Sequence, residues 1–129
     1  MNASTAAPAG PAPPAGLDAQ ALARLKELDP DGRHGVVLRV LSAYETSLQR
    51  MLAQLRGAQF PAQPAVVASV AHTLKSSSAS VGALALAKTC AEVESRLRDG
   101  DASSLGGDLA RLIAEGEAAL VAVAAILRP

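Results

Sequence analysis

Apolar residues recur at helical spacing through most of the chain. The clearest run lies in residues 33–56, where the spacing alternates between four and three residues over about five turns. Its apolar positions are Val37, Leu41, Tyr44, Leu48, Met51 and Leu55. Residues at this spacing share one side of an α-helix, so the pattern predicts a long amphipathic helix whose apolar side packs into a core.

Four more helices are predicted from the same periodicity and from the residues that interrupt it. Their predicted ranges are 18–28, 64–81, 83–99 and, after Ser103 or Ser104, a last helix that ends at 127. Pro64 suits the first turn of its helix, where a missing N–H costs nothing, and Gly82 suits the C-terminal cap of the same helix. In the first helix, Leu22, Leu25 and Leu28 fall on one side.

Four long helices joined by short connections predict an all-α domain. The expected architecture is an antiparallel up-down four-helix bundle with a short extra N-terminal helix. Alanine accounts for 29 of the 129 residues, whereas the chain has one Phe, one Tyr and no Trp. Because residues that favour strands are scarce, an all-β or α/β fold is disfavoured.

Residues 1–16 differ in composition from the rest of the chain. Four prolines stand among alanine and glycine, and no side chain is charged. Such a segment cannot bury a core. We therefore expect a disordered Pro/Ala-rich leader over 1–16 and a helical bundle domain over 17–129. A proline-rich ligand for a partner protein is the other interpretation of the leader.

Charge and cysteine content exclude several classes of function. Twelve Lys and Arg balance twelve Asp and Glu, so no basic stripe is available to bind nucleic acid or an anionic membrane. No apolar run approaches the roughly 18 residues of a membrane span, and no secretion signal begins the chain. The single cysteine, Cys90, cannot form an internal disulfide. We therefore expect a cytoplasmic protein with no nucleic-acid or membrane partner.

Metal and nucleotide sites are not expected either. One cysteine and two separate histidines do not form a zinc-binding cluster. The pair Gly106-Gly107 lacks the lysine and the preceding strand of a phosphate-binding loop. The sequence therefore predicts no cofactor.

His72 is the residue that a purely structural bundle does not explain. If Val70 and Leu74 face the core, His72 lies about 200° around the helix from Val70 and points outward. Its neighbours on that side are Lys75 and four small residues, Ala68, Ser69, Ser76 and Ala79. A neutral imidazole nitrogen is nucleophilic near pH 7 and can hold a phosphoryl group through an N–P bond. That transfer needs mainly positioning and charge compensation, so His72 with Lys75 is a chemically sufficient acceptor site.

His34 illustrates the ordinary alternative. It begins the helix predicted over 33–56, directly after a turn, and no ring of small residues surrounds it. We interpret it as a solvated surface residue.

The stretch from Ala71 to Gly100 resembles histidine-containing phosphotransfer (HPt) domains. The pattern of that family is His-x-Leu-Lys-Gly, small residues, a hydrophobic-Gly pair, and then Leu, Cys and an acidic residue on the next helix. The matching positions are His72, Leu74, Lys75, Ser77, Ala79, Val81, Gly82, Leu86, Cys90 and Glu94. The order and lengths of the helices extend the resemblance loosely over residues 17–127.

The resemblance implies a phosphorelay carrier. His72 would accept a phosphoryl group, through Nε2, from an aspartate of a response-regulator receiver domain and pass it to an aspartate of another receiver. Receivers and a hybrid histidine kinase are the expected partners, and Mg²⁺ is expected on the receiver only. The protein would not be an enzyme with its own nucleotide or metal site, and we expect a monomer.

Residues around His72 have expected roles. Lys75 would stabilise the phosphoryl group. Ser76 stands where the family usually has glycine, so its side chain either crowds the phosphoryl group and the docked partner or donates a hydrogen bond to a phosphoryl oxygen. Glu94 would either orient the imidazole of His72 or pair with Arg98 one turn along its own helix.

Two further expectations concern the helix predicted over 83–99. Arg98 is a candidate second cation for the phosphoryl group. Cys90 is expected in the core rather than as a nucleophile, because it lies within the apolar stripe.

Some interpretations stay open at the level of sequence. Val36 and Val40 either flank His72 as part of a docking surface or pack on the first helix. An HPt-like module that binds a receiver or kinase without carrying phosphate is an alternative function, favoured only by Ser76. A histidine phosphatase or a bundle metalloenzyme lacks the second histidine and the carboxylate cluster that such sites need.

Overall fold

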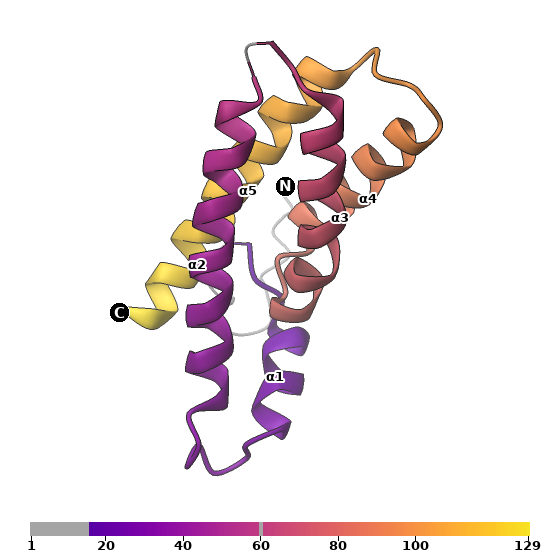
Figure 1. Ribbon diagram of the computed structural model, residues 1–129. Helices are drawn as coiled ribbons and strands as arrows, with labels where there is room; N and C mark the ends of the chain where they lie inside the picture. Colours follow the sequence, from indigo (N-terminus) through magenta and orange to yellow (C-terminus); the bar gives the residue numbers. More distant parts are fainter. Residues whose placement is uncertain (1–15, 60) are drawn as a thin grey trace, which may run out of the picture.

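The structure is a computed structural model that describes residues 16–59 and 61–129. Those residues form five α-helices (Figure 1). The helices are α1 (Ala19–Glu27), α2 (Val36–Gly57), α3 (Pro64–Val81), α4 (Leu84–Arg98) and α5 (Leu105–Leu127). Each helix begins and ends within three residues of its predicted range. The leader predicted over 1–16 lies outside the described residues except for Gly16.

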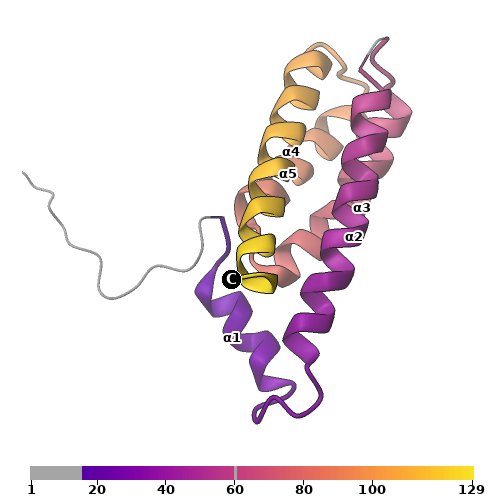
Figure 2. The same ribbon diagram turned by 90° about the vertical axis from the view of Figure 1, so that its left-hand side faces the viewer.

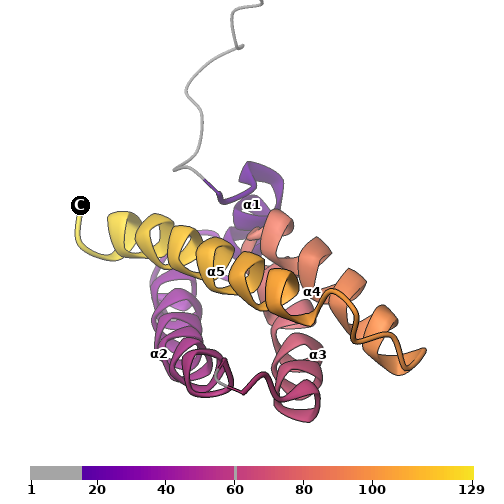
Figure 3. The same cartoon turned by 90° about the horizontal axis from the view of Figure 1, so that it is seen from above.

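Helices α2 to α5 form a four-helix bundle. Around the bundle, α2 packs on α3 and α5, and α4 packs on α3 and α5. The view from above in Figure 3 shows this closed arrangement. The short helix α1 packs against α2 and α3 at the end of the bundle where α3 ends (Figures 1 and 2). The predicted all-α bundle with a short extra N-terminal helix is confirmed.

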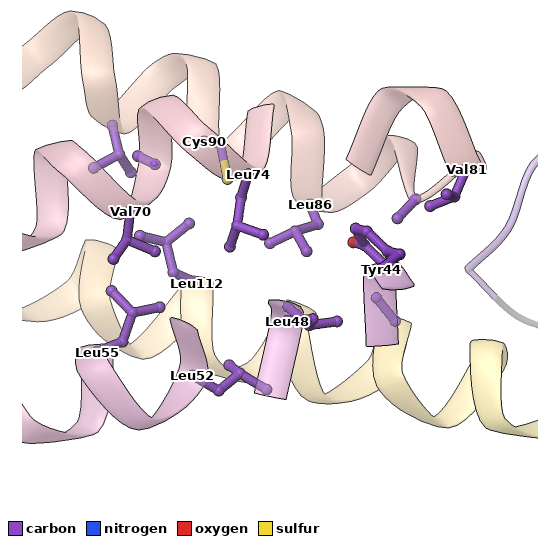
Figure 4. Packing of buried hydrophobic residues seen from close by; sticks show 14 of the residues in the cluster. Tyr44, Leu48, Leu52, Leu55, Val70, Leu74, Val81, Leu86, Cys90 and Leu112 are labelled. Carbon is purple, nitrogen blue, oxygen red and sulfur yellow. The ribbon is translucent and has the colours of Figure 1, made fainter. Parts of the chain in front are cut away.

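Leucine side chains from all four long helices meet in the core (Figure 4). The largest of them that are fully buried are Leu41, Leu48, Leu52, Leu55, Leu74, Leu86, Leu109 and Leu112. A polar contact crosses the core as well, because the hydroxyl groups of Tyr44 and Ser78 lie 2.8 Å apart. Burial raises the pKa of Tyr44 to about 12, so the phenol stays protonated at neutral pH. The contact holds α2 against α3 without leaving a buried hydroxyl unpaired.

The side of α1 that carries its leucines is not its buried side. Leu28 is 69% exposed, and Leu22 and Leu25 are only half-buried, whereas Leu17 and Ala21 are buried. The reason is the position of α1 at the end of the bundle. Only its first turn reaches the core, and Leu28 ends the helix where no other helix covers it.

Gly82 is the point where the start of α1 contacts the end of α3. Its φ of +89° is in the left-handed region, and it caps the C-terminus of α3, as predicted. Its carbonyl oxygen accepts a hydrogen bond from the backbone N–H of Asp18 at 2.8 Å. A Cβ at this position would lie 2.6 Å from the same backbone nitrogen. Glycine is therefore required both by the backbone conformation and by the close approach of α1.

Candidate functional site

His72 lies in the middle of α3 and points away from the core. Its side chain is 72% exposed, while Val70 and Leu74 are buried, as the periodicity predicts. The small neighbours of His72 leave the outer side of α3 open. Ser69, Ser76 and Ala79 are exposed, and Ala68 is half-buried.

Glu94 reaches His72 from α4. Its Oε2 lies 2.5 Å from Nδ1 of His72, and its Oε1 lies 2.6 Å from Nζ of Lys75. The two helices that carry these residues pack along their lengths, so the carboxylate is held between them. The Glu94 side chain is only 15% exposed, whereas the imidazole that it contacts is open to solvent.

The ionised form of Glu94 is favoured at this position. The hydrogen bond from Lys75, followed by the hydrogen bond from His72, lowers the pKa of the carboxyl group below its usual value. An ionised carboxylate only accepts hydrogen bonds, so the neutral imidazole donates its Nδ1–H to Glu94. The lone pair of Nε2 is then free, and the site can present one nucleophilic nitrogen to an approaching electrophile.

Comparison with known proteins identifies the family of this chain. The model of the family described as Hpt domain matches residues 39–124, which is two thirds of the chain and includes His72, Lys75 and Glu94. This chain belongs to the Hpt domain family. The family consists of phosphotransfer carriers of phosphorelays, whose members interact with receiver domains and kinases.

A solved structure shares the fold of this Hpt domain. It is the crystal structure of histidine-containing phosphotransfer protein B from Pseudomonas aeruginosa PAO1, with a TM-score of 0.74 and 22% sequence identity. The alignment covers 88% of this chain and 96% of that chain. A comparison with curated protein sequences gave no significant match.

The structure separates the two predicted partners of Glu94. The pair that it makes is with His72 and Lys75, and not with Arg98. Arg98 is the last residue of α4 and is exposed, and in the described part of the chain no ion pair joins it to another residue. Its contribution to the phosphoryl site therefore stays a prediction.

Arg96, on the same helix, has a role that the sequence pattern did not predict. It forms an ion pair with Asp108, which is buried at the start of α5, at 2.5 Å. The hydrogen bond that Arg96 donates to Asp108 raises the pKa of Arg96. This pair ties α4 to α5. Its partners are twelve positions apart in the chain, so helical spacing gave no signal for it.

Cys90 lies one turn before Glu94 and is fully buried. Burial, together with the nearby carboxylates of Glu115 and Glu94, raises the pKa of its thiol to about 12. A thiol of this kind is not a nucleophile at neutral pH, so the predicted core position is confirmed.

An apolar groove lies between α2 and α3 beside the outer side of α3. It has a volume of about 390 Å³ and is lined by Val40, Ala43, Tyr44, Ser47, Ser77, Ser80 and Val81. Val40 therefore belongs to the surface beside α3. Val36 instead lines a separate hollow next to the loop between α1 and α2, together with Lys26 and Asp29.

The described residues contain neither a candidate metal site nor a candidate membrane span. Among residues 16–59 and 61–129, no group of three or more His, Cys, Asp or Glu side chains is placed to hold a metal ion. No helix in the described part of the chain combines the length and apolarity needed to cross a membrane.

Proposed function

We propose that this Hpt domain carries a phosphoryl group on Nε2 of His72 from an aspartate of one response-regulator receiver domain to an aspartate of another. The observation that carries the proposal is the 2.5 Å contact between Glu94 and Nδ1 of an otherwise open imidazole. This contact supports the proposal, because an ionised Glu94 accepts a hydrogen bond from Nδ1–H and Nε2 is then the unprotonated nitrogen.

The transfer step exchanges one bond to phosphorus for another. The lone pair of Nε2 attacks the phosphorus of an aspartyl phosphate, so the N–P bond forms while the P–O bond to the aspartate breaks. The electron pair of that bond returns to the receiver's carboxylate. The imidazole becomes positively charged, and the carboxylate of Glu94 beside Nδ1 compensates this charge. The reverse step delivers the group to the next receiver.

Two cations assist the phosphoryl group in this proposal. Lys75 is held by Glu94 one turn from His72, so its ammonium group lies close to the oxygens of a phosphoryl group on Nε2. Arg98 is the second cation, whose long exposed side chain reaches the site once a partner is docked. Mg²⁺ belongs to the receiver, and the Hpt domain supplies neither a metal nor a nucleotide site.

The receiver docks over α3 and the apolar groove beside it. A standard interface covers about 800 Å² of each partner, a patch with a radius of about 16 Å. Ser80 in the groove is eight residues from His72, or about 12 Å along the helix axis, so a partner centred on His72 also covers the groove. Lys75 is the single charged residue of α3, so little charge is desolvated when this surface is covered.

A labelled receiver tests the proposal. The Hpt domain is incubated with a receiver that carries ³²P-phosphoaspartate, and acid-labile, base-stable label is expected to appear on the Hpt domain. A His72→Gln variant should take none. If the wild-type protein binds the receiver but takes no label from several receivers, the alternative of a binding module that carries no phosphate is correct instead.

A chelator tests the assignment of Mg²⁺ to the partner. Phosphoramidate is a small phosphoryl donor that needs no protein partner. With EDTA, loading of His72 by phosphoramidate should be unchanged, whereas transfer from the receiver should stop. Loss of both would place a metal requirement on the Hpt domain itself.

The compartment and the oligomeric state follow the same proposal. A cytoplasmic protein is consistent with the free thiol of Cys90. A monomer leaves the surface around His72 open to receivers. Sedimentation of the full chain at several concentrations tests the monomer, because a concentration-dependent mass would contradict it.

A further inference from the structure

Helix α3 is rich in hydroxyl side chains, and most of them have a partner within the protein. Thr73 donates to the carbonyl oxygen of Ser69 at 3.1 Å, and Ser80 donates to that of Ser76 at 3.1 Å. Ser77 donates to the carbonyl oxygen of Thr73 at 3.4 Å. In the core, Ser78 pairs with Tyr44.

Two hydroxyl groups of α3 differ from these four. In the structure as described, the side chains of Ser69 and Ser76 form no hydrogen bond with the protein, and both are exposed. They lie three residues before and four residues after His72. Residues at these spacings are neighbours on a helix surface, so the two hydroxyl groups flank the imidazole.

A docked partner changes the surroundings of these hydroxyl groups. Water is excluded from the surface, and a hydroxyl group that is covered without a partner is costly. A phosphoryl group on Nε2 brings three acceptor oxygens and two negative charges into the same space. Glu94 carries a negative charge beside the ring and offers no donor. The two serines are therefore the donors that α3 can add to the cations Lys75 and Arg98.

We propose that Ser69 and Ser76 donate hydrogen bonds to the phosphoryl group on His72 and prolong the lifetime of the phosphohistidine. The inference rests on the proposed function and concerns two further residues that contact the phosphoryl group at that site. It gives the serine at position 76 a role that a glycine cannot fill.

The expected effect on lifetime follows from the chemistry of hydrolysis. Water forms a new P–O bond to the phosphorus, the P–Nε2 bond breaks, and its electron pair returns to the imidazole. In a loose transition state the three phosphoryl oxygens carry less negative charge than in the bound group. Donors to those oxygens therefore stabilise the bound phosphoryl group more than the transition state, and hydrolysis slows.

The test measures the half-life of phosphohistidine in the full chain loaded by phosphoramidate and freed of excess donor. Ser69→Ala and Ser76→Ala should each shorten the half-life about threefold, and the double variant about tenfold, as expected for modest hydrogen bonds. Thr73→Ala is the matched control, because its exposed hydroxyl is already bonded to a carbonyl oxygen. Its half-life should equal that of the wild-type protein.

A merely structural role is separated by two further measurements. Ser76→Thr keeps a hydroxyl group and should restore most of the half-life. Alanine favours helix more than serine does, so Ser76→Ala should raise the thermal midpoint slightly while it shortens the half-life. Equal or longer half-lives in both serine variants would overturn the inference. Failure of the proposed function looks different, because the wild-type protein would then take no phosphoryl group on His72.

Discussion

His34 and His72 are both exposed histidines, but they differ in which of their groups form hydrogen bonds with other side chains. His34 lies in the loop before α2, where its backbone N–H donates to Asp29 and its carbonyl oxygen accepts from Arg39. Within the described residues, its ring has no hydrogen-bond partner. At His72 the backbone is satisfied by the helix, and the ring is held by Glu94.

The difference shows what exposure alone does not provide. A ring on a loop can rotate and exchange its proton between two nitrogens. The ring of His72 is held by a carboxylate from a second helix, which contacts Nδ1 and leaves Nε2 as the nitrogen that we propose as the nucleophile.

The largest effect is expected from removing either ring. His72→Gln should abolish phosphorylation by a phosphorylated receiver, a loss of more than about a hundredfold, because the nucleophile is gone. His34→Gln should be phosphorylated like the wild-type protein. Acid-labile phosphate, measured after a fixed time, distinguishes the two. Label that persists in His72→Gln would contradict the site.

The next effect concerns the carboxylate that distinguishes the two rings. Glu94→Gln should slow transfer about tenfold or more, because the neutral amide compensates the charge of the phosphorylated imidazole less well. Lys75→Ala should slow transfer to a similar extent. Glu92→Gln is the matched control, since Glu92 lies on the same helix and pairs with Arg111 instead. Equal rates in Glu94→Gln and Glu92→Gln would show that the contact does not assist the reaction.

Alanine substitutions at two glycines should differ in their effect on stability: Gly82, which caps the helix that carries His72, and Gly35, which follows His34. Gly82→Ala should cost about 3 kcal/mol, because a positive φ is combined with a clash against the backbone of Asp18. Gly35→Ala, beside His34, has a positive φ but open space around its Cβ, so about 1 kcal/mol is expected. Urea unfolding measures both. Equal losses of stability in the two variants would show that the clash with Asp18 adds nothing to the cost at Gly82.

The smallest effect is the dependence on acid. The lowered pKa of Glu94 means that its contribution to stability is present above pH 4.5 and is lost as the pH falls through the lowered value. The carboxyl resonance of Glu94 in NMR should therefore titrate below pH 4.5. Lys75→Ala removes the largest cause of the shift, so the midpoint should rise toward the usual value. An unchanged midpoint in Lys75→Ala would contradict the assigned cause.

Sequence was sufficient for those features that a single helix determines. Pro64 and Gly82 mark the ends of α3, and periodicity within it places His72 outward. Features that depend on two helices were only partly predictable. Glu94 had two candidate partners, because the choice depends on how α4 is rotated and shifted against α3.

Other features of packing lay beyond the local pattern. The apolar spacing of Leu22, Leu25 and Leu28 is real, but it does not say which side of α1 the bundle covers. In α2, Leu52 is fully buried and Met51 half-buried, because α5 approaches that side closely through Gly116. Such details follow from the arrangement of helices and not from the sequence of one.

The ring nitrogen that carries phosphorus can be identified by NMR. The ¹⁵N-labelled chain is phosphorylated by a receiver, and long-range ¹H–¹⁵N correlation NMR with ³¹P coupling identifies the nitrogen that carries phosphorus. We expect phosphorus on Nε2 of His72, with Nδ1 still protonated and bonded to Glu94. Phosphorus on Nδ1 of His72, or on His34, would contradict it.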